Sequence, residues 1–132
     1  MANVTVQHKT GEREKAGTDF DVDIRFNYED GTHSDWFRLD HPNFDDRERG
    51  DVDTYGVETH NPSAIVDCEM RVRHEPAHLN DEELYDAWFL CWMSVTTPSK
   101  RLEYDYDGWI KVPPGDASWH SVRLILTRTE AV

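Results

Sequence analysis

Three acidic segments hold the residues of this chain whose chemistry is easiest to name. The first contains Ala16-Gly17-Thr18-Asp19, which offers backbone, hydroxyl and carboxylate oxygens within a few residues. The other two cover residues 40–50 and 74–87 and are rich in aspartate and glutamate. Oxygen atoms from several loops are the ligands of a hard cation such as calcium, which takes about six to eight of them. A calcium site therefore requires a fold that brings the three segments together.

The net charge limits the classes of partner that this chain can bind. Lys and Arg number 14 against 27 Asp and Glu, so the formal net charge is -13. This excess argues against a nucleic acid partner, because phosphates require a basic surface. It also opposes direct attraction to an anionic membrane unless a bound cation changes the local charge. A solvated acidic rim that keeps the protein soluble is the alternative to a cation site.

The length predicts a single domain over residues 1–132. No apolar run is long enough for a transmembrane segment, and Val4 and Val6 already read as a strand where a secretory signal would lie. We expect a soluble protein, either cytosolic or the mature form of a secreted one, with peripheral association with a membrane as a further alternative. Cys68 and Cys91 lie in apolar runs and are expected to be buried free thiols, with a cross-strand disulfide as the alternative.

Period-two alternation of apolar and polar residues predicts strands through most of the chain. It is clearest from Phe20 to Tyr28, from Val66 to Val72 and from Val122 to Thr127. Asp30-Gly31 predicts a hairpin turn that leads into a strand over His33 to Leu39. Further strands are predicted at Val52 to Val57, Trp88 to Val95, Leu102 to Tyr106 and Trp109 to Val112, the last two being two short strands or one bent strand. Helical periodicity is limited to one possible turn at residues 80–85, so the pattern indicates an all-β sandwich.

The order of the strands predicts where the acidic segments lie. If successive strands run antiparallel, the first, third and fifth connections leave the same end of the sandwich. These connections are residues 10–19, 40–50 and 74–87, and their carboxylates are Glu12, Glu14, Asp19, Asp40, Asp45, Asp46, Glu48, Glu75, Asp81, Glu82, Glu83 and Asp86. Repulsion among so many carboxylates at one end favours a bound cation over a bare rim. We therefore expect calcium there.

The motifs along the chain resemble the PLAT domain, the β-sandwich module named for polycystin, lipoxygenase and alpha-toxin. The similarity spans nearly the whole chain, in order, through Val4-Thr5-Val6, Thr10-Gly11, Ala16-Gly17-Thr18-Asp19, Trp36-Phe37-Arg38-Leu39-Asp40, Glu48-Arg49-Gly50-Asp51-Val52-Asp53-Thr54-Tyr55, Asp86-Ala87-Trp88-Phe89-Leu90 and Gly108-Trp109-Ile110. The resemblance implies a sandwich of two four-stranded antiparallel sheets. It also implies a module without catalytic activity that associates with membranes, often through calcium, or that contacts a protein partner.

The resemblance further implies calcium ligands, residue by residue. A first ion would take the Gly17 carbonyl and the Asp86 carboxylate, with the Ala87 carbonyl beside them. Lys15 stands where calcium-binding members often carry an aspartate, which removes a ligand from this first site. The preferred site is therefore the second one, formed by Thr18, Asp19, Asp45 and Asp46. Asp40 and Asn43 would fall near a third position.

Apolar residues in the same segments are candidate membrane contacts, namely Phe44, Leu79, Leu84 and Tyr85. Apolar loop tips beside the ions enter the bilayer interface in calcium-dependent members, and the resemblance implies that role here. The alternative is that these side chains pack under their own loops. The alternative function is a calcium-independent protein-interaction module that localises or regulates a partner enzyme.

One further motif suggests chemistry of another class. His74-Glu75-Pro76-Ala77-His78 matches the zinc-protease pattern His-Glu-x-x-His. That chemistry needs both histidines on one face of a helix, and Pro76 opposes a helix interior. We therefore interpret the match as a coincidence.

Overall fold

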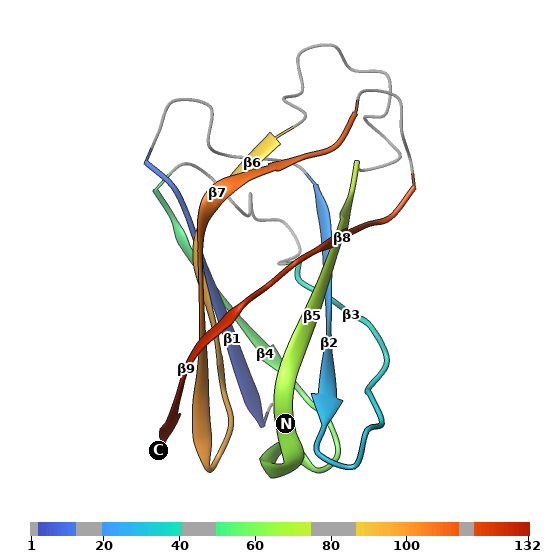
Figure 1. Cartoon of the computed structure of the whole chain (residues 1–132), viewed down its shortest axis with the longest axis vertical. Coiled ribbons are helices and arrows are strands. Elements are labelled where there is room, and N and C mark those ends of the chain that lie inside the picture. Colours follow the sequence, from blue (N-terminus) through green and yellow to red (C-terminus); the bar gives the residue numbers. More distant parts are fainter. Residues whose placement is uncertain (1–2, 13–19, 41–49, 75–86, 114–117) are drawn as a thin grey trace.

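The computed structural model describes residues 3–12, 20–40, 50–74, 87–113 and 118–132. They form two sheets that pack face to face (Figure 1). The strands are β1 (Val4–Thr10), β2 (Asp21–Tyr28), β3 (Phe37–Arg38), β4 (Val52–Val57), β5 (Ile65–Arg73), β6 (Ala87–Thr96), β7 (Lys100–Lys111), β8 (His120–Val122) and β9 (Leu126–Ala131). A 3-10 turn, η1 (Pro62–Ala64), precedes β5.

The first sheet has five strands in the order β4-β1-β6-β7-β9, and the second has four in the order β3-β2-β5-β8. Neighbouring strands are antiparallel throughout both sheets. The predicted all-β sandwich is therefore confirmed, although one sheet has a strand more than expected. The continuous apolar run of β6 occupies the centre of the five-stranded sheet, where both neighbours cover its edges.

The additional strand comes from the last alternating segment, which was wrongly predicted as one strand. β8 pairs with β5, whereas β9 pairs with β7, so the chain passes from one sheet to the other between them. Val122 is buried, but Ile125 is 60% and Leu126 is 36% exposed. The apolar residues of the segment therefore do not share one buried face, which is the assumption behind the single strand.

The strand predicted over His33 to Leu39 is shorter in the structure. The turn at Asp30-Gly31 is confirmed, with Gly31 at φ 88° and the Thr32 N–H donating to Asp30 Oδ1 over 2.9 Å. After it, the Ser34 hydroxyl accepts the Phe26 N–H over 2.9 Å. A side chain thus replaces part of the backbone ladder, and regular pairing with β2 resumes only at Phe37.

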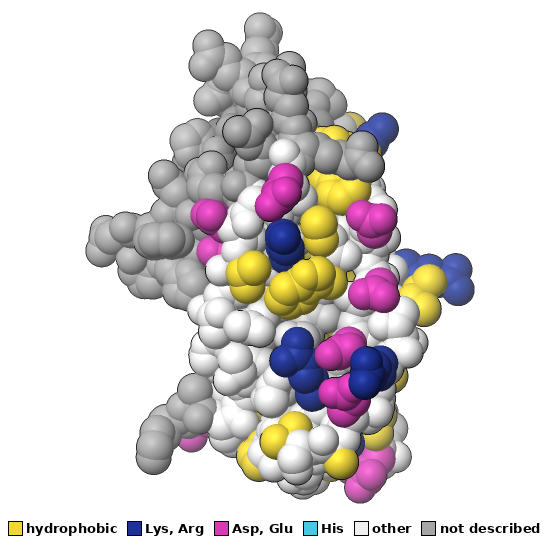
Figure 2. All heavy atoms as spheres, turned by 90° about the vertical axis from the view of Figure 1, so that its left-hand side faces the viewer, with side chains coloured by type: hydrophobic (Ala, Val, Ile, Leu, Met, Phe, Trp, Pro, Cys, Tyr) yellow, Lys and Arg dark blue, Asp and Glu magenta, His cyan; other side chains and the backbone are white. Residues whose placement is uncertain are grey.

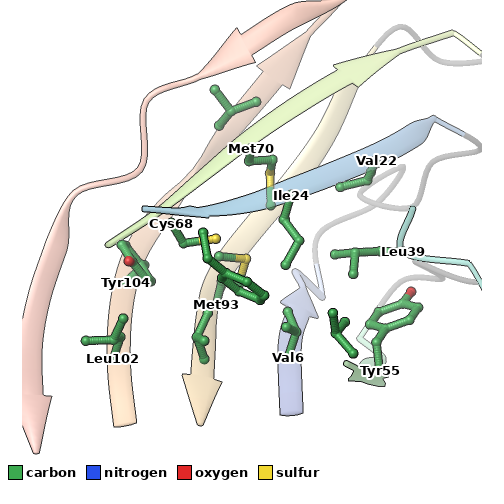
Figure 3. Packing of buried hydrophobic residues seen from close by; sticks show 14 of the residues in the cluster. Val6, Val22, Ile24, Leu39, Tyr55, Cys68, Met70, Met93, Leu102 and Tyr104 are labelled. Carbon is green, nitrogen blue, oxygen red and sulfur yellow. The ribbon is translucent and has the colours of Figure 1, made fainter. Parts of the chain in front are cut away.

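Alternating residues of both sheets meet in one hydrophobic core. Ile24 and Met70 of the four-stranded sheet point toward Val6 and Met93 of the five-stranded sheet (Figure 3). At the start of β5 the alternation shifts, because the ladder between β2 and β5 is irregular after Asn27. Ile65 is buried there, while Val66, which the alternation had placed with the core residues, is 40% exposed. Such an irregularity cannot be read from period-two spacing.

Neither Cys68 nor Cys91 forms a disulfide, as expected. Cys68 of β5 is buried as predicted, whereas Cys91 of β6 is only half-buried. The alternative of a cross-strand disulfide is therefore wrong.

Candidate functional site

The strand ends that flank the three acidic segments lie together at one end of the sandwich (Figure 1). We call this the acidic end, defined by the described residues on either side of segments 13–19, 41–49 and 75–86: Glu12, Phe20, Asp40, Gly50, His74 and Ala87. For these flanking residues, the position predicted from strand order is confirmed. The described residues before and after each of the three segments therefore lie at the same end of the sandwich.

A short row of backbone hydrogen bonds holds three of these positions in the five-stranded sheet. The Gly50 N–H donates to the Gly11 carbonyl over 3.0 Å, and the Gly11 N–H donates to the Phe89 carbonyl over 2.9 Å. We call Gly50, Gly11 and Phe89 the glycine bracket. A β-carbon at Gly11 would stand only 2.5 Å from Cδ1 of Phe89, and Gly50 has φ 80°. Both positions therefore require glycine.

The bracket also sets the direction of one predicted ligand. The Phe89 carbonyl points toward β1, because it accepts the Gly11 N–H. Carbonyls two residues apart on a strand point the same way, so the Ala87 carbonyl faces the side on which the chain continues after Gly11. Ala87 lies on β6 opposite Lys111 of β7, which is on the other side of that strand. Its carbonyl is thus directed toward the β1 side of β6, where Gly11 and Glu12 follow that strand.

Ion pairs fix the corresponding positions in the four-stranded sheet. Asp21, at the start of β2, accepts the Arg73 Nε–H over 3.0 Å and lies 3.3 Å from Arg38 Nη1. The Leu39 N–H donates to the Val22 carbonyl over 2.9 Å. These contacts join the start of β2, the end of β3 and the end of β5, which are the residues next to the three segments.

His74 joins the two sheets at the acidic end. Its ring packs edge-on against Phe20, with 5.3 Å between centroids. Its Nε2 lies 3.1 Å from the Val112 carbonyl and 3.0 Å from the Pro113 carbonyl, so Nε2 carries the hydrogen and donates to them. A donating Nε2 is not a metal ligand, and the histidine follows a strand rather than lying on a helix. Both facts agree with the interpretation of the zinc-protease pattern as a coincidence.

The structure also shows an ionic cluster around the buried Asp23, which the sequence analysis missed. Asp23 is only 3% exposed and accepts hydrogen bonds from Arg38 Nε over 2.5 Å and from Arg71 Nε and Nη2 over 3.0 and 2.9 Å. Beside it, Arg25 donates to Glu69 over 2.5 Å, and this hydrogen bond lowers the pKa of the Glu69 carboxyl. Opposite charges at facing positions of β2, β3 and β5 are the signal that would have predicted this cluster.

Two tryptophans stack on the arginines of this face. The Trp36 ring lies 4.6 Å from the Arg25 guanidinium carbon and 4.3 Å from that of Arg71. The Trp119 ring lies 4.1 Å from the Arg71 carbon and 4.4 Å from that of Arg73. Cation–π contacts of this kind restrict the guanidinium groups and favour Arg over Lys. They make the four-stranded sheet a firm support for the acidic end.

Two of the predicted ligands lie among the described residues. Ala87 is half-buried at the start of β6, as described above. Asp40 is exposed directly after Leu39. Burial works to lower the pKa of Arg38, but the hydrogen bond to Asp23 and the charges of Asp21, Asp23 and Asp40 outweigh it and raise that pKa. Asp40 therefore already has a cationic neighbour.

The other predicted site residues lie outside the described part of the chain. They are the proposed ligands Gly17, Thr18, Asp19, Asn43, Asp45, Asp46 and Asp86 and the proposed membrane contacts Phe44, Leu79, Leu84 and Tyr85. Within the described ranges, no group of three or more His, Cys, Asp or Glu side chains is arranged to hold a metal ion. The same ranges contain no helix with the length and apolar character needed to cross a membrane.

Comparison with known proteins identifies the fold of this chain. A family model, PLAT/LH2 domain, matches residues 4–118. No match was found among the curated proteins. Among solved structures, the chain is similar to the alpha toxin of Clostridium absonum, with a TM-score of 0.65 and 21% identity over 92% of this chain. It is also similar to the alpha-toxin of an avian strain of Clostridium perfringens, with a TM-score of 0.55 and 21% identity.

A second kind of similar structure is an enzyme with a described calcium response. Coral 8R-lipoxygenase has a TM-score of 0.64 and 22% identity over 93% of this chain, and it is described as showing calcium activation via a C2-like domain. The chain spans 31% of the toxins and 16% of the lipoxygenase. At this level of identity the comparison establishes a shared fold.

Proposed function

The chain belongs to the PLAT/LH2 domain family, and on this basis we propose that it is a non-catalytic module that binds calcium at its acidic end and thereby attaches to membrane lipid. The observation that carries the proposal is the gathering of all the strand ends beside the three acidic segments. A multi-loop oxygen site needs its loops to start and finish close together on a rigid frame. The glycine bracket and the ion pairs of Asp21 supply such a frame.

The oxygen donors available at this end fit calcium better than a transition metal. The segments that the acidic end supports carry carboxylates, a threonine hydroxyl and backbone carbonyls. Hard oxygen donors suit calcium and magnesium, whereas zinc and copper sites use histidine and cysteine. The carbonyl of Ala87 faces the β1 side of β6, from which the chain enters the first segment, and this direction supports its assignment beside Gly17 and Asp86. Thr18, Asp19, Asp45 and Asp46 remain the proposed second site, with Asp40 and Asn43 near a third position.

Calcium also removes an electrostatic obstacle to lipid binding. A chain of net charge -13 is repelled by anionic phospholipid. Calcium ions at the acidic end reverse the local charge and share their remaining coordination positions with lipid phosphates. Phe44, Leu79, Leu84 and Tyr85 would then enter the bilayer interface, where each buried large apolar side chain contributes about 1.5–3 kcal/mol.

Calorimetric titration with calcium, followed by liposome co-sedimentation, tests the proposal. We expect saturable calcium binding and sedimentation with vesicles of phosphatidylserine and phosphatidylcholine that is lost in chelator. Magnesium at equal concentration serves as the control, because it demands a smaller octahedral site and keeps its waters. Vesicle binding that is equal in calcium and chelator would contradict the calcium dependence, and absence of a calcium heat would contradict the metal site.

The alternative is a calcium-independent module that localises or regulates a partner enzyme. Lys15, in the first acidic segment, favours it because an ammonium group competes with a cation for the same carboxylates. The two functions give different results in one pull-down. Recovery of a protein partner in chelator, together with no vesicle binding in calcium, would support the alternative.

A further inference from the structure

Strand β9 forms one margin of the five-stranded sheet and lies beyond residue 118, where the family match stops (Figure 1). Within the described part of the chain, β9 pairs with β7 alone, so its other side is an open edge. An open edge offers unpaired backbone donors and acceptors to another strand. We infer that β9 pairs antiparallel with β9 of a second copy of this chain, about a two-fold axis at Thr129.

The backbone N–H and carbonyl groups of β9 point in the directions that this axis requires. The Val132 N–H donates to the Ser99 carbonyl over 3.1 Å, so Val132 turns its N–H toward β7. Antiparallel strands alternate this direction from residue to residue, and Thr129 lies opposite Leu102 in the same register. The N–H and carbonyl of Thr129 and Ala131 therefore point to the open edge. An axis at Thr129 places that residue opposite its own copy, where the two exchange a pair of backbone hydrogen bonds.

The charges along β9 select the same axis. Arg128 and Glu130 lie on the outer face of the sheet, because they pair with Glu103 and Arg101 of β7. An axis at Thr129 puts Arg128 of each copy opposite Glu130 of the other. An axis at Arg128 or at Glu130 would put like charges opposite each other, which is unfavourable. The sequence is thus self-complementary in one symmetric register, as an isologous contact requires.

Pairing in this register continues a charge pattern that already exists within one chain. The side chains of Arg128 and Glu130 are 65% and 36% exposed, and they form an ion pair with each other. Arg101 Nε lies 3.1 Å from Glu103 Oε1 on the neighbouring strand. Across the joined sheet, each row then alternates in sign through Arg101, Glu130, Arg128 of the second copy and Glu103 of the second copy. Figure 2 shows acidic and basic side chains side by side on this face.

Exposed apolar residues stand at both ends of the same strand. Leu126 is 36% and Val132 is 73% exposed. The ladder with β7 is irregular between Arg128 and Leu126, so Leu126 does not continue the alternation of Arg128, Glu130 and Val132. The charges of Arg128 and Glu130, rather than a contact between these two apolar side chains, therefore define the axis.

The contact is small, so the dimer is weak. Pairing of two short strands buries less than a standard interface, and we expect a dissociation constant on the order of 10 µM to 1 mM. Two copies of charge -13 also repel each other. The measurement therefore uses about 0.15 M salt, which screens charges more than about 8 Å apart but leaves contacting pairs largely intact.

Sedimentation equilibrium of the whole chain over a concentration series tests the inference. We expect the wild type to dimerise. Arg128→Glu and Glu130→Arg should each raise the dissociation constant of the dimer roughly tenfold, because each change places like charges opposite each other twice. An equimolar mixture of the two variants should associate as a heterodimer, because acidic strands then face basic ones. A wild type that stays monomeric up to about 1 mM, or a mixture no tighter than its components, would overturn the inference.

A backbone variant and its matched control test the register separately. Thr129→Pro removes an N–H that points to the open edge and leaves the ladder with β7 intact. Thr129→Ala keeps that N–H. We expect Thr129→Pro to remain monomeric and Thr129→Ala to dimerise as the wild type does, with circular dichroism showing that both are folded. Equal association of the two variants would contradict backbone pairing through β9.

Discussion

Gly11 and Phe89 touch in two ways at the acidic end. The Gly11 N–H donates to the Phe89 carbonyl over 2.9 Å, and the Phe89 ring covers the α-carbon of Gly11 so closely that a β-carbon would stand 2.5 Å from Cδ1. The ring is held from its other side by Trp109, edge-on at 5.1 Å between centroids. The ring therefore has little freedom to move away from a larger residue at position 11.

We predict that Gly11→Ala destabilises the protein by about 1–3 kcal/mol, the usual cost of overpacking. It should also weaken calcium binding, because the displaced strand ends are those that support the proposed ligands. Urea unfolding and calcium titration measure the two effects. Gly108→Ala is the control, since a β-carbon there would come no nearer to Tyr106 than 3.4 Å, an ordinary van der Waals contact. A calcium affinity unchanged by Gly11→Ala would show that the bracket does not position the site.

Calcium that binds only the folded chain should raise the melting temperature by mass action. We predict that Asp19→Ala abolishes this rise if the second site is the main one. Glu29→Ala is the matched control: it removes a carboxylate from the turn after β2, at the opposite end of the sandwich. Differential scanning fluorimetry with and without calcium measures both. A full calcium-dependent shift in Asp19→Ala would contradict the assignment of Asp19.

Replacement of Asp23 tests the ionic cluster. Asp23→Asn leaves Arg38 and Arg71 facing a neutral amide, and loss of a partner from a buried ion pair costs about 3–5 kcal/mol. The two arginine side chains are 41% and 26% exposed, so solvent screening reduces the expected loss to about 1–3 kcal/mol. Urea unfolding provides the value. Asp105→Asn, at an exposed position of β7, should change stability by less than about 0.5 kcal/mol.

The buried thiol of Cys68 should make the folded protein less stable at alkaline pH. Burial, followed by the charges of Asp67 and Glu69, raises the pKa of Cys68 well above its usual value. In the unfolded chain the thiol has its usual pKa of about 8.5, so at higher pH it ionises in the unfolded chain but not in the folded one. The free energy of unfolding is therefore unaffected by this thiol below about pH 8.5. Above that pH it falls by at most about 1.4 kcal/mol per pH unit.

Unfolding by urea between about pH 7 and pH 9.5 checks this slope, and Cys68→Ala should flatten it. Cys68 should also resist alkylation in the folded protein and react after unfolding, because the reactive species is the thiolate. Rapid modification of Cys68 in the native state would contradict the burial of its sulfur.

Much of the fold follows from alternation along the sequence, because one face of each strand must be buried. Phe20, Val22, Ile24, Phe26 and Tyr28 are all buried, as their spacing predicts. Alternation assigns a side chain to a face, but it does not reveal irregular ladders, and for this reason Val66 was misplaced by one residue. It also does not reveal a change of sheet, and for this reason β8 and β9 were merged.

Buried polar residues were the other feature that the sequence analysis did not predict. Asp23 occupies a position that alternation assigns to solvent, yet it is buried and accepts hydrogen bonds from Arg38 and Arg71, which in turn stack on tryptophan rings. Its burial depends on partners from β3 and β5, which single-strand patterns do not include. The sequence predicted which connections lie at the acidic end, because strand order alone decides this. The ligand geometry depends on segments that lie outside the described residues.

The two ends of the described chain lie opposite the acidic end (Figure 1). Val4 pairs with Val57, the last residue of β4, and Val132 binds Ser99 in the turn between β6 and β7. An affinity tag or a fluorescent protein joined at either position therefore leaves the acidic end facing away from the attachment. A sensor chip that captures the protein by such a tag presents every molecule in one orientation, so calcium and vesicles can reach the acidic end without detaching the protein.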